Sequence, residues 1–66
     1  MVGNMNTWFV YFLKSEREDW YYVGSTKRLV ARVAEHNAGR VYSTKAYKPL
    51  KLVHKIEFDS EQEARM

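Results

Sequence analysis

The sequence predicts a small α+β domain in which a β-hairpin, a helix and a third strand form a three-stranded antiparallel sheet flanked by helices. Three observations predict this fold class. Two aromatic runs lie on either side of a short charged segment, a helical apolar pattern follows them, and an alternating apolar segment comes next. With 66 residues and no cysteine, the chain has room for one domain with a small core and no disulfide.

The first aromatic run is predicted to be the central strand. Residues 1–6 are polar and lack periodicity, so we expect a disordered leader there and the domain itself over residues 7–66. Residues 7–13 are rich in aromatic and β-branched side chains, which favours a strand. Because both alternating faces of this strand are apolar, we expect it in the middle of the sheet.

The second aromatic run should pair with the first. The charged segment 14–19 has the length of a hairpin connection and leads directly into the run at 20–24. Gly24 is predicted to end this strand, and Ser25 or Thr26 is placed to cap the helix that follows.

A helix is predicted over residues 27–38. Four apolar residues recur at helical spacing and form one stripe: Leu29, Val30, Val33 and Ala34. The helix should stop at Asn37-Ala38-Gly39, because glycine is the usual residue just past a helix end.

A polar line runs along the edge of this stripe. Arg28, Arg32 and His36 follow one another at intervals of four residues, so they lie on one side of the helix, with His36 nearest the apolar stripe. Together with Tyr21 and Tyr22 on the preceding strand, they suggest a surface that binds phosphate.

The chain then predicts a basic loop and a third strand. Residues 40–49 carry basic and hydroxyl side chains, and Pro49 argues against regular structure at the end of this loop. Residues 50–58 alternate as a strand does, and we expect one buried face. His54 lies on that face, which favours a packing role over a chemical one. The residues of the face are Leu50, Leu52, His54, Ile56 and Phe58.

A second helix is predicted at the C-terminal end. Asp59 and Ser60 open it, with Glu63 three positions after Ser60 in a capping-box arrangement. Since the chain ends at Met66 after hardly two turns, we expect this helix to be truncated and the domain to be incomplete.

The charge distribution favours a polyanionic partner. The net charge is +3, but residues 26–55 contain eight basic residues against one acid, whereas the rest of the chain is acidic. Charge alone is equally consistent with a solvated basic face. No apolar run reaches the roughly 18 residues of a membrane span, and a signal peptide pattern is missing, so we expect a cytoplasmic location.

The spacing of these landmarks resembles the GIY-YIG nuclease family. Phe9-Val10-Tyr11 occupies the position of the first motif and Tyr22-Val23-Gly24 that of the second, and Arg32 and His36 follow at the family's separations. The context looks especially like the small single-domain bacterial members. Phe9 replaces the glycine of the first motif, a change that leaves the tyrosine with its chemical role.

The resemblance implies an endonuclease domain that hydrolyses phosphodiester bonds, in DNA more than in RNA. It implies that Tyr11 is the general base, that Tyr22 contacts the water or phosphate, that Arg32 grips the scissile phosphate and lowers the pKa of the tyrosine, and that His36 receives the proton. We assign the remaining candidates to substrate binding outside the reacting group: Gly24, Arg28, Lys45, Lys48 and Lys51.

The resemblance also implies a divalent ion, Mg²⁺ or Mn²⁺. The family's metal-binding glutamate follows the alanine of the second helix by four residues. Counting from Ala64 places it at position 68, beyond Met66, so no metal ligand is assigned within this chain.

Two other hypotheses remain open at this point. The chain is also consistent with a nucleic-acid-binding module that does not cleave, or with an interaction module that associates through its aromatic strands. In the same way, Tyr11 and Tyr22 are consistent with a simple cross-strand aromatic pair, and Arg32 and His36 with ordinary edge residues of a helix.

Overall fold

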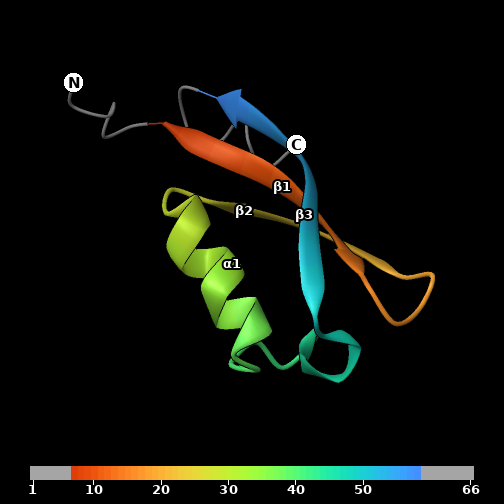
Figure 1. Ribbon diagram of the computed structural model, residues 1–66. Coiled ribbons are helices and arrows are strands. Elements are labelled where there is room, and N and C mark those ends of the chain that lie inside the picture. The colour runs from red at the N-terminus through yellow and green to blue at the C-terminus, as the bar shows by residue number, and fades with distance from the viewer. Residues whose placement is uncertain (1–6, 59–66) are drawn as a thin grey trace.

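A computed structural model describes residues 7–58, which form an antiparallel sheet with one α-helix packed against it (Figure 1). In this part of the chain the sheet has three strands, β1 (Trp8–Ser15), β2 (Tyr21–Thr26) and β3 (Leu50–Phe58), in the order β2-β1-β3. The helix α1 (Leu29–Asn37) follows β2, and a 3₁₀ turn, η1 (Lys45–Tyr47), precedes β3. The α+β class is confirmed. The predicted leader and second helix lie outside the described residues.

The central position predicted for the first aromatic run is confirmed, since β1 pairs with both other strands. On the helix side of β1, Tyr11, Leu13 and Ser15 are buried, as the alternation of a strand requires. Tyr11 lies opposite Gly24 on β2 and opposite Lys55 on β3. The hydroxyl-bearing ring of Tyr11 is therefore held in the middle of the sheet.

The hairpin between β1 and β2 is closed by a buried serine. Ser15 extends β1 beyond the predicted end, and its hydroxyl donates to the carbonyl of Tyr47 at 2.7 Å. The same oxygen accepts the backbone N–H groups of Arg17 and Glu18 at 3.1 and 3.2 Å. One side chain thus ties the hairpin turn to the loop that precedes β3.

The end of β2 and the start of α1 differ from the prediction. β2 continues through Gly24 to Thr26, because residue 26 still pairs with Phe9 of β1. The helix begins at Leu29, and the N-cap residue Arg28 forms no side-chain capping bond. Thr26 instead accepts the backbone N–H of Arg28 at 3.0 Å, so neither Ser25 nor Thr26 caps the helix.

The predicted stop signal of the helix is confirmed. Gly39 has a φ of +78°, a conformation that glycine adopts without strain. Its N–H donates to the carbonyl of His36 at 3.1 Å, and the N–H of Arg40 donates to that of Glu35 at 3.0 Å. These two bonds form a Schellman motif, which satisfies the last carbonyl groups of the helix.

The buried face of α1 is rotated from the predicted stripe. Leu29 and Val33 pack against the core as expected, but Val30 is 85% exposed and Ala34 is exposed as well. His36 is fully buried in their place. At about 100° per residue, positions 29, 33 and 36 form one face, and positions 30 and 34 lie well to one side of it. The polar line is thereby brought toward the sheet.

The loop before β3 is more ordered than predicted. It contains the turn η1, and it buries Val41 and Thr44. The side chain of Asn37 at the end of α1 accepts the N–H of Leu50 at 2.6 Å and donates to its carbonyl at 2.9 Å. Both backbone groups of this buried residue are satisfied by one amide, which fixes β3 against the helix.

The single buried face predicted for β3 is wrong, because a bulge divides the strand. Leu52 pairs with Leu13, but His54 pairs with Phe12, so Val53 is the extra residue between them. Leu50 and Leu52 therefore face the helix, whereas the alternate residues from His54 onward face the other side. His54 is exposed and packs its ring against Phe12 with 5.4 Å between the ring centroids.

Candidate active site

Tyr11 is the residue around which the candidate site is built. Its side chain is only 1% exposed, and its hydroxyl lies 2.9 Å from Nε2 of His36. A Cβ atom at Gly24 would lie 2.6 Å from this hydroxyl, closer than any real contact. The glycine is needed so that the Tyr11 hydroxyl can lie over β2.

His36 occupies the last turn of α1 and connects three elements. Its Nε2 faces Tyr11 on β1, and its Nδ1 lies 2.8 Å from Oγ1 of Thr44 in the loop. All three side chains are fully buried or nearly so. Because both ring nitrogens have a partner, the ring is held in one orientation.

Tyr22 on β2 completes the aromatic wall beside His36. Its ring centroid lies 5.0 Å from that of His36 and 6.2 Å from that of Tyr11. On its other side, Tyr22 stacks on Trp20, and Trp20 stacks on Tyr47 with ring centroids 3.8 Å apart and an angle of 4°. The stack fixes Tyr22 through the side chains of Trp20, just before β2, and of Tyr47 in η1.

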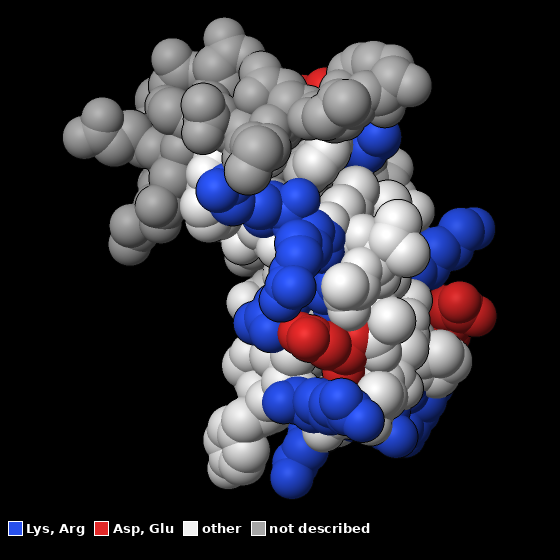
Figure 2. All heavy atoms as spheres, turned by 90° about the vertical axis from the view of Figure 1, so that its left-hand side faces the viewer, with Lys and Arg blue, Asp and Glu red and all other residues white. Residues whose placement is uncertain are grey.

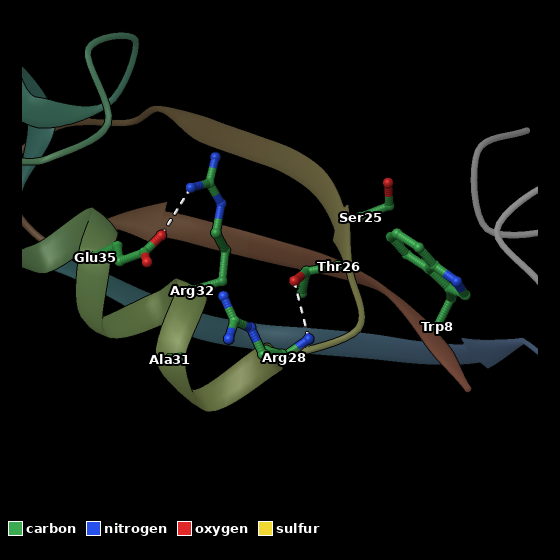
Figure 3. A pocket seen from close by; sticks show the side chains of 7 residues that line it. All are labelled: Trp8, Ser25, Thr26, Arg28, Ala31, Arg32 and Glu35. Carbon is green, nitrogen blue, oxygen red and sulfur yellow. Dashed lines mark hydrogen bonds and ion pairs between the residues drawn. The ribbon is translucent and has the colours of Figure 1, made fainter. Parts of the chain in front are cut away.

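Arg32 lies one turn before His36 and forms an ion pair with Glu35, with 2.8 Å between Nη1 and Oε1. Both side chains are more than a third exposed. They line one end of a pocket of about 300 Å³, and Trp8 and Ser25 lie together at the other end (Figure 3). The remaining lining residues are Thr26, Arg28 and Ala31.

The electrostatics keep both partners of the central hydrogen bond neutral. Burial raises the pKa of Tyr11, and the adjacent Arg32 guanidinium opposes this without overcoming it. Burial, helped by the positive charge of Arg32, lowers the pKa of His36. Arg32 does act to lower the pKa of Tyr11, as expected. The pKa of Tyr11 is nevertheless raised, because desolvation is the larger effect.

The predicted catalytic residues therefore meet in one place. A neutral phenol faces a neutral imidazole that can accept its proton, with a guanidinium beside them. If Tyr11 and Tyr22 were only a cross-strand aromatic pair, the hydrogen bond from β1 to α1 that joins Tyr11 and His36, 25 positions apart, would not be required. The arrangement can move a proton from Tyr11 to His36 next to a group that binds anions.

The predicted substrate contacts fall into two groups. Arg28 lines the same pocket as Arg32. Lys45, Lys48 and Lys51 lie elsewhere. Lys45 lies over the ring of Tyr42 at 5.2 Å, and Lys48 lines a separate pocket beside Asn37 and Arg17.

Lys51 lies on the side of the sheet away from α1, because it alternates with Leu50 and Leu52, which face the helix. The three lysines are therefore not neighbours of the Tyr11 hydroxyl, and their contact with a substrate stays a prediction. The face that carries α1 shows Lys and Arg side chains along its length, interrupted by acidic ones (Figure 2).

A metal site is not assembled by residues 7–58. This range contains no group of three side chains of the kinds that bind metals. The acid of the site, Glu35, is engaged by Arg32, and this ion pair lowers the pKa of Glu35. The described residues thus do not fit a divalent ion on their own, and the predicted position 68 lies outside them.

Several residues of the site were missed by the sequence analysis. Thr44 was one hydroxyl among several in a basic loop, and no periodicity marks it as the partner of His36. Trp20 was predicted only as a strand residue, and Tyr47 only as a loop residue. The spacing of Arg32 and Glu35, three positions apart on a helix, does carry a signal for an ion pair.

The order of these landmarks along one small sheet and helix is that of a nuclease-type domain. Comparison with known families agrees: the profile of the GIY-YIG catalytic domain matches residues 7–66, so the chain belongs to the GIY-YIG family. Within the described residues, we find no helix with the length and apolarity needed to cross a membrane.

The chain is similar to bacterial proteins of one group. It is 42% identical over 64 residues to the UPF0213 protein lin0209 of Listeria innocua, a match that covers 96% of this chain and 70% of the relative. It is also 42% identical over 57 residues to the UPF0213 protein LMOf2365_0181 of Listeria monocytogenes, covering 85% of this chain and 63% of the relative.

Proposed function

We propose that this protein is a metal-dependent endonuclease that hydrolyses phosphodiester bonds in DNA. The observation that carries the proposal is the buried hydrogen bond between Tyr11 and His36, with Arg32 positioned between this pair and a surface pocket. Membership of the GIY-YIG family supports the nuclease class. The basic residues around α1 support a polyanionic substrate.

The phosphate approaches through the pocket beside α1. Arg32 lines this pocket and also interacts with the Tyr11 hydroxyl, so a phosphate bound by its guanidinium is brought next to Tyr11. Glu35 holds Nη1 of Arg32 and leaves its other N–H groups for the phosphate. Arg28 contacts a neighbouring phosphate from the same wall of the pocket.

Tyr11 and His36 act together as the base. As the oxygen of a water molecule forms a bond to phosphorus and the bond to the leaving oxygen breaks, Oη of Tyr11 accepts the proton of the water. Tyr11 passes its own proton to Nε2 of His36 in the same event. This coupling removes the need for a free phenolate, which burial of Tyr11 disfavours.

The leaving oxygen takes its proton from solvent. Divalent metals are generally required in this family, and such an ion, when bound, stabilises the added charge of the transition state. Since residues 7–58 do not form a metal site, the roles given above are those of the chain's own side chains.

The test is a nicking assay on supercoiled plasmid with Mg²⁺ and with chelator. We expect Mg²⁺-dependent nicking by a chain extended past position 68, which supplies the predicted metal ligand, with a loss of about 10²-fold or more in Arg32→Ala, because one transition-state contact is removed. Arg17→Ala is the matched control, since Arg17 lies on the hairpin outside the site and its loss should leave the rate unchanged.

The contrary results are equally specific. Nicking that survives chelator or Arg32→Ala contradicts the proposal. DNA binding that weakens steeply with salt, in the absence of any nicking, identifies the non-cleaving binding module instead.

A further inference from the structure

The loop residue Thr44 has a place in the site that the proposed reaction does not yet use. Its side chain is fully buried, and Oγ1 lies 2.8 Å from Nδ1 of His36. The same oxygen lies 3.4 Å from the carbonyl of Val41, toward which its hydroxyl can donate. Tyr11, His36, Thr44 and this carbonyl therefore form one continuous chain of hydrogen bonds.

Two arrangements of protons are compatible with these distances. In the first, His36 carries its proton on Nδ1, donates it to Thr44, and accepts the Tyr11 hydroxyl at Nε2. In the second, Thr44 donates to Nδ1, and Nε2–H donates to the oxygen of Tyr11. The two arrangements differ in where the proton of the Tyr11 hydroxyl goes.

The first arrangement satisfies every buried donor. Tyr11 donates to His36, His36 donates to Thr44, and Thr44 donates to the carbonyl of Val41. In the second arrangement, the Tyr11 hydroxyl proton has no acceptor among the described residues, since the adjacent Arg32 only donates. Leaving a buried donor unsatisfied costs about 1–3 kcal/mol.

The carbonyl of Val41 is the acceptor of the Thr44 hydroxyl in the first arrangement. It already accepts the backbone N–H groups of Thr44 and Lys45 at 3.1 and 3.0 Å. The Thr44 hydroxyl adds a third and longer contact to this carbonyl at 3.4 Å, and in the first arrangement its proton points there and away from His36. With its proton directed there, the Thr44 oxygen is free to accept from Nδ1–H.

We propose that Thr44 is a positioning residue that holds His36 in the Nδ1–H tautomer, so that Nε2 presents a lone pair to the Tyr11 hydroxyl. In the opposite tautomer Nε2 already carries a proton, so the neutral imidazole would be unable to take the phenolic proton at this nitrogen. The catalytic consequence rests on the proposed function, whereas the tautomer itself does not.

The test measures the tautomer directly, by long-range nitrogen–proton NMR correlation of the His36 imidazole. The wild-type chain and Thr44→Ser, which keeps the hydroxyl, are expected to show the Nδ1–H form. Thr44→Val removes the acceptor at nearly constant volume and is expected to shift His36 to the Nε2–H form. Ser43→Ala is the matched control, because Ser43 is exposed beside Thr44.

Nicking rates provide the second readout. With the wrong tautomer, Thr44→Val should lose about 10²- to 10⁴-fold in kcat with KM unchanged, and Thr44→Ser should retain most of kcat. An Nε2–H tautomer in the wild-type chain, or an unchanged tautomer in Thr44→Val, overturns the inference. The Nδ1–H form in a chain that does not nick DNA overturns the proposed function and leaves the role of Thr44 intact.

Discussion

At the scale of single residues, the site combines two demands on Tyr11 that oppose each other. Burial fixes the position of its hydroxyl but raises its pKa, and Arg32 offsets only part of this rise. The hydrogen bond to His36 resolves the conflict, because the phenol can lose its proton to a neighbour at the moment it accepts one. The proposed reaction therefore requires a neutral His36.

The titration of His36 is the first prediction at this scale. The groups around the imidazole are Tyr11, Tyr22, Thr44, Arg32 and Glu35. Burial, followed by the charge of Arg32, lowers the pKa, and Glu35 opposes them. We expect a midpoint below the ordinary value of about 6.5, and we expect Arg32→Met to raise it.

The measurement is an NMR titration of the imidazole protons in a His54→Gln background, which leaves one histidine in the chain. The acid limb of the nicking rate should follow the same midpoint, since a protonated His36 cannot accept the Tyr11 proton. A midpoint at or above the ordinary value contradicts the prediction.

Gly24 carries the second prediction at this scale. In Gly24→Ala the new Cβ atom would lie 2.6 Å from the Tyr11 hydroxyl and 2.9 Å from the ring of Tyr22. Because Tyr11 is buried and bonded to His36, it cannot move freely, and we expect overpacking to cost about 1–3 kcal/mol of unfolding free energy. We also expect the hydroxyl to be displaced from His36.

Urea denaturation measures the loss of stability, and the NMR resonances of His36 report the displaced hydroxyl. Val23→Ala is the control, since its side chain is exposed on the neighbouring position. If Gly24→Ala changes neither the stability nor the His36 environment, the close approach of the Tyr11 hydroxyl to Gly24 does not require a glycine.

At the scale of elements, α1 is anchored unequally at its two ends. Its first turn has no side-chain cap, whereas its last turn is closed by Gly39 and joined to β3 by Asn37. His36 lies in the anchored turn, next to both contacts. The helix thus holds His36 firmly, and it presents Arg28 from the end with fewer contacts.

The junction between α1 and β3 gives the prediction for this scale. Asn37→Ala leaves the N–H and the carbonyl of buried Leu50 without their side-chain partner. We expect a loss of about 1–3 kcal/mol in unfolding free energy, together with faster amide exchange at Leu50. Arg40→Ala, an exposed position just past the helix end, should change neither quantity. Equal losses in both variants would mean that the amide contacts do not anchor β3.

At the scale of the whole molecule, the core and the candidate site overlap at Tyr11 and His36. The buried cluster of Tyr11, Leu13 and Leu50 includes the proposed base, and the fully buried His36 bonds to it. A domain of this size has few other apolar contacts to draw on. Changes to the proton-transfer pair are therefore expected to change stability as well as rate.

The pH dependence of stability follows from this overlap. Since the pKa of folded His36 is lowered, the unfolded chain binds a proton more readily, and protonation favours unfolding. The contribution of neutral His36 is fully present above its unfolded pKa, and it is lost as the pH falls from about 6.5 through the lower folded value.

We therefore expect the unfolding free energy to decrease between about pH 7.5 and 5.5, as measured by urea denaturation. The decrease should be smaller in His36→Gln, which has no titrating imidazole at this position. A slope that is the same in both proteins would show that His36 does not couple protonation to folding.

The sequence by itself determined the order of the elements and the central position of β1. These features depend on local alternation, on helical spacing and on glycine at the helix end, all of which are properties of neighbouring residues. The candidate site was located by the family resemblance of residues 9–11 and 22–24. A motif of this kind is also a local pattern, so it can be recognised without the tertiary structure.

Only the tertiary structure decided which faces are buried and which groups meet. The bulge at Val53 turns half of β3 away from the helix, and the packing of α1 buries His36 in place of Val30. Thr44 reaches His36 because the loop that follows α1 packs its side chain against the last turn of the helix. Such contacts join residues that are distant along the chain, and burial also decides the direction of the Tyr11 pKa. No local pattern encodes that balance between desolvation and a neighbouring charge.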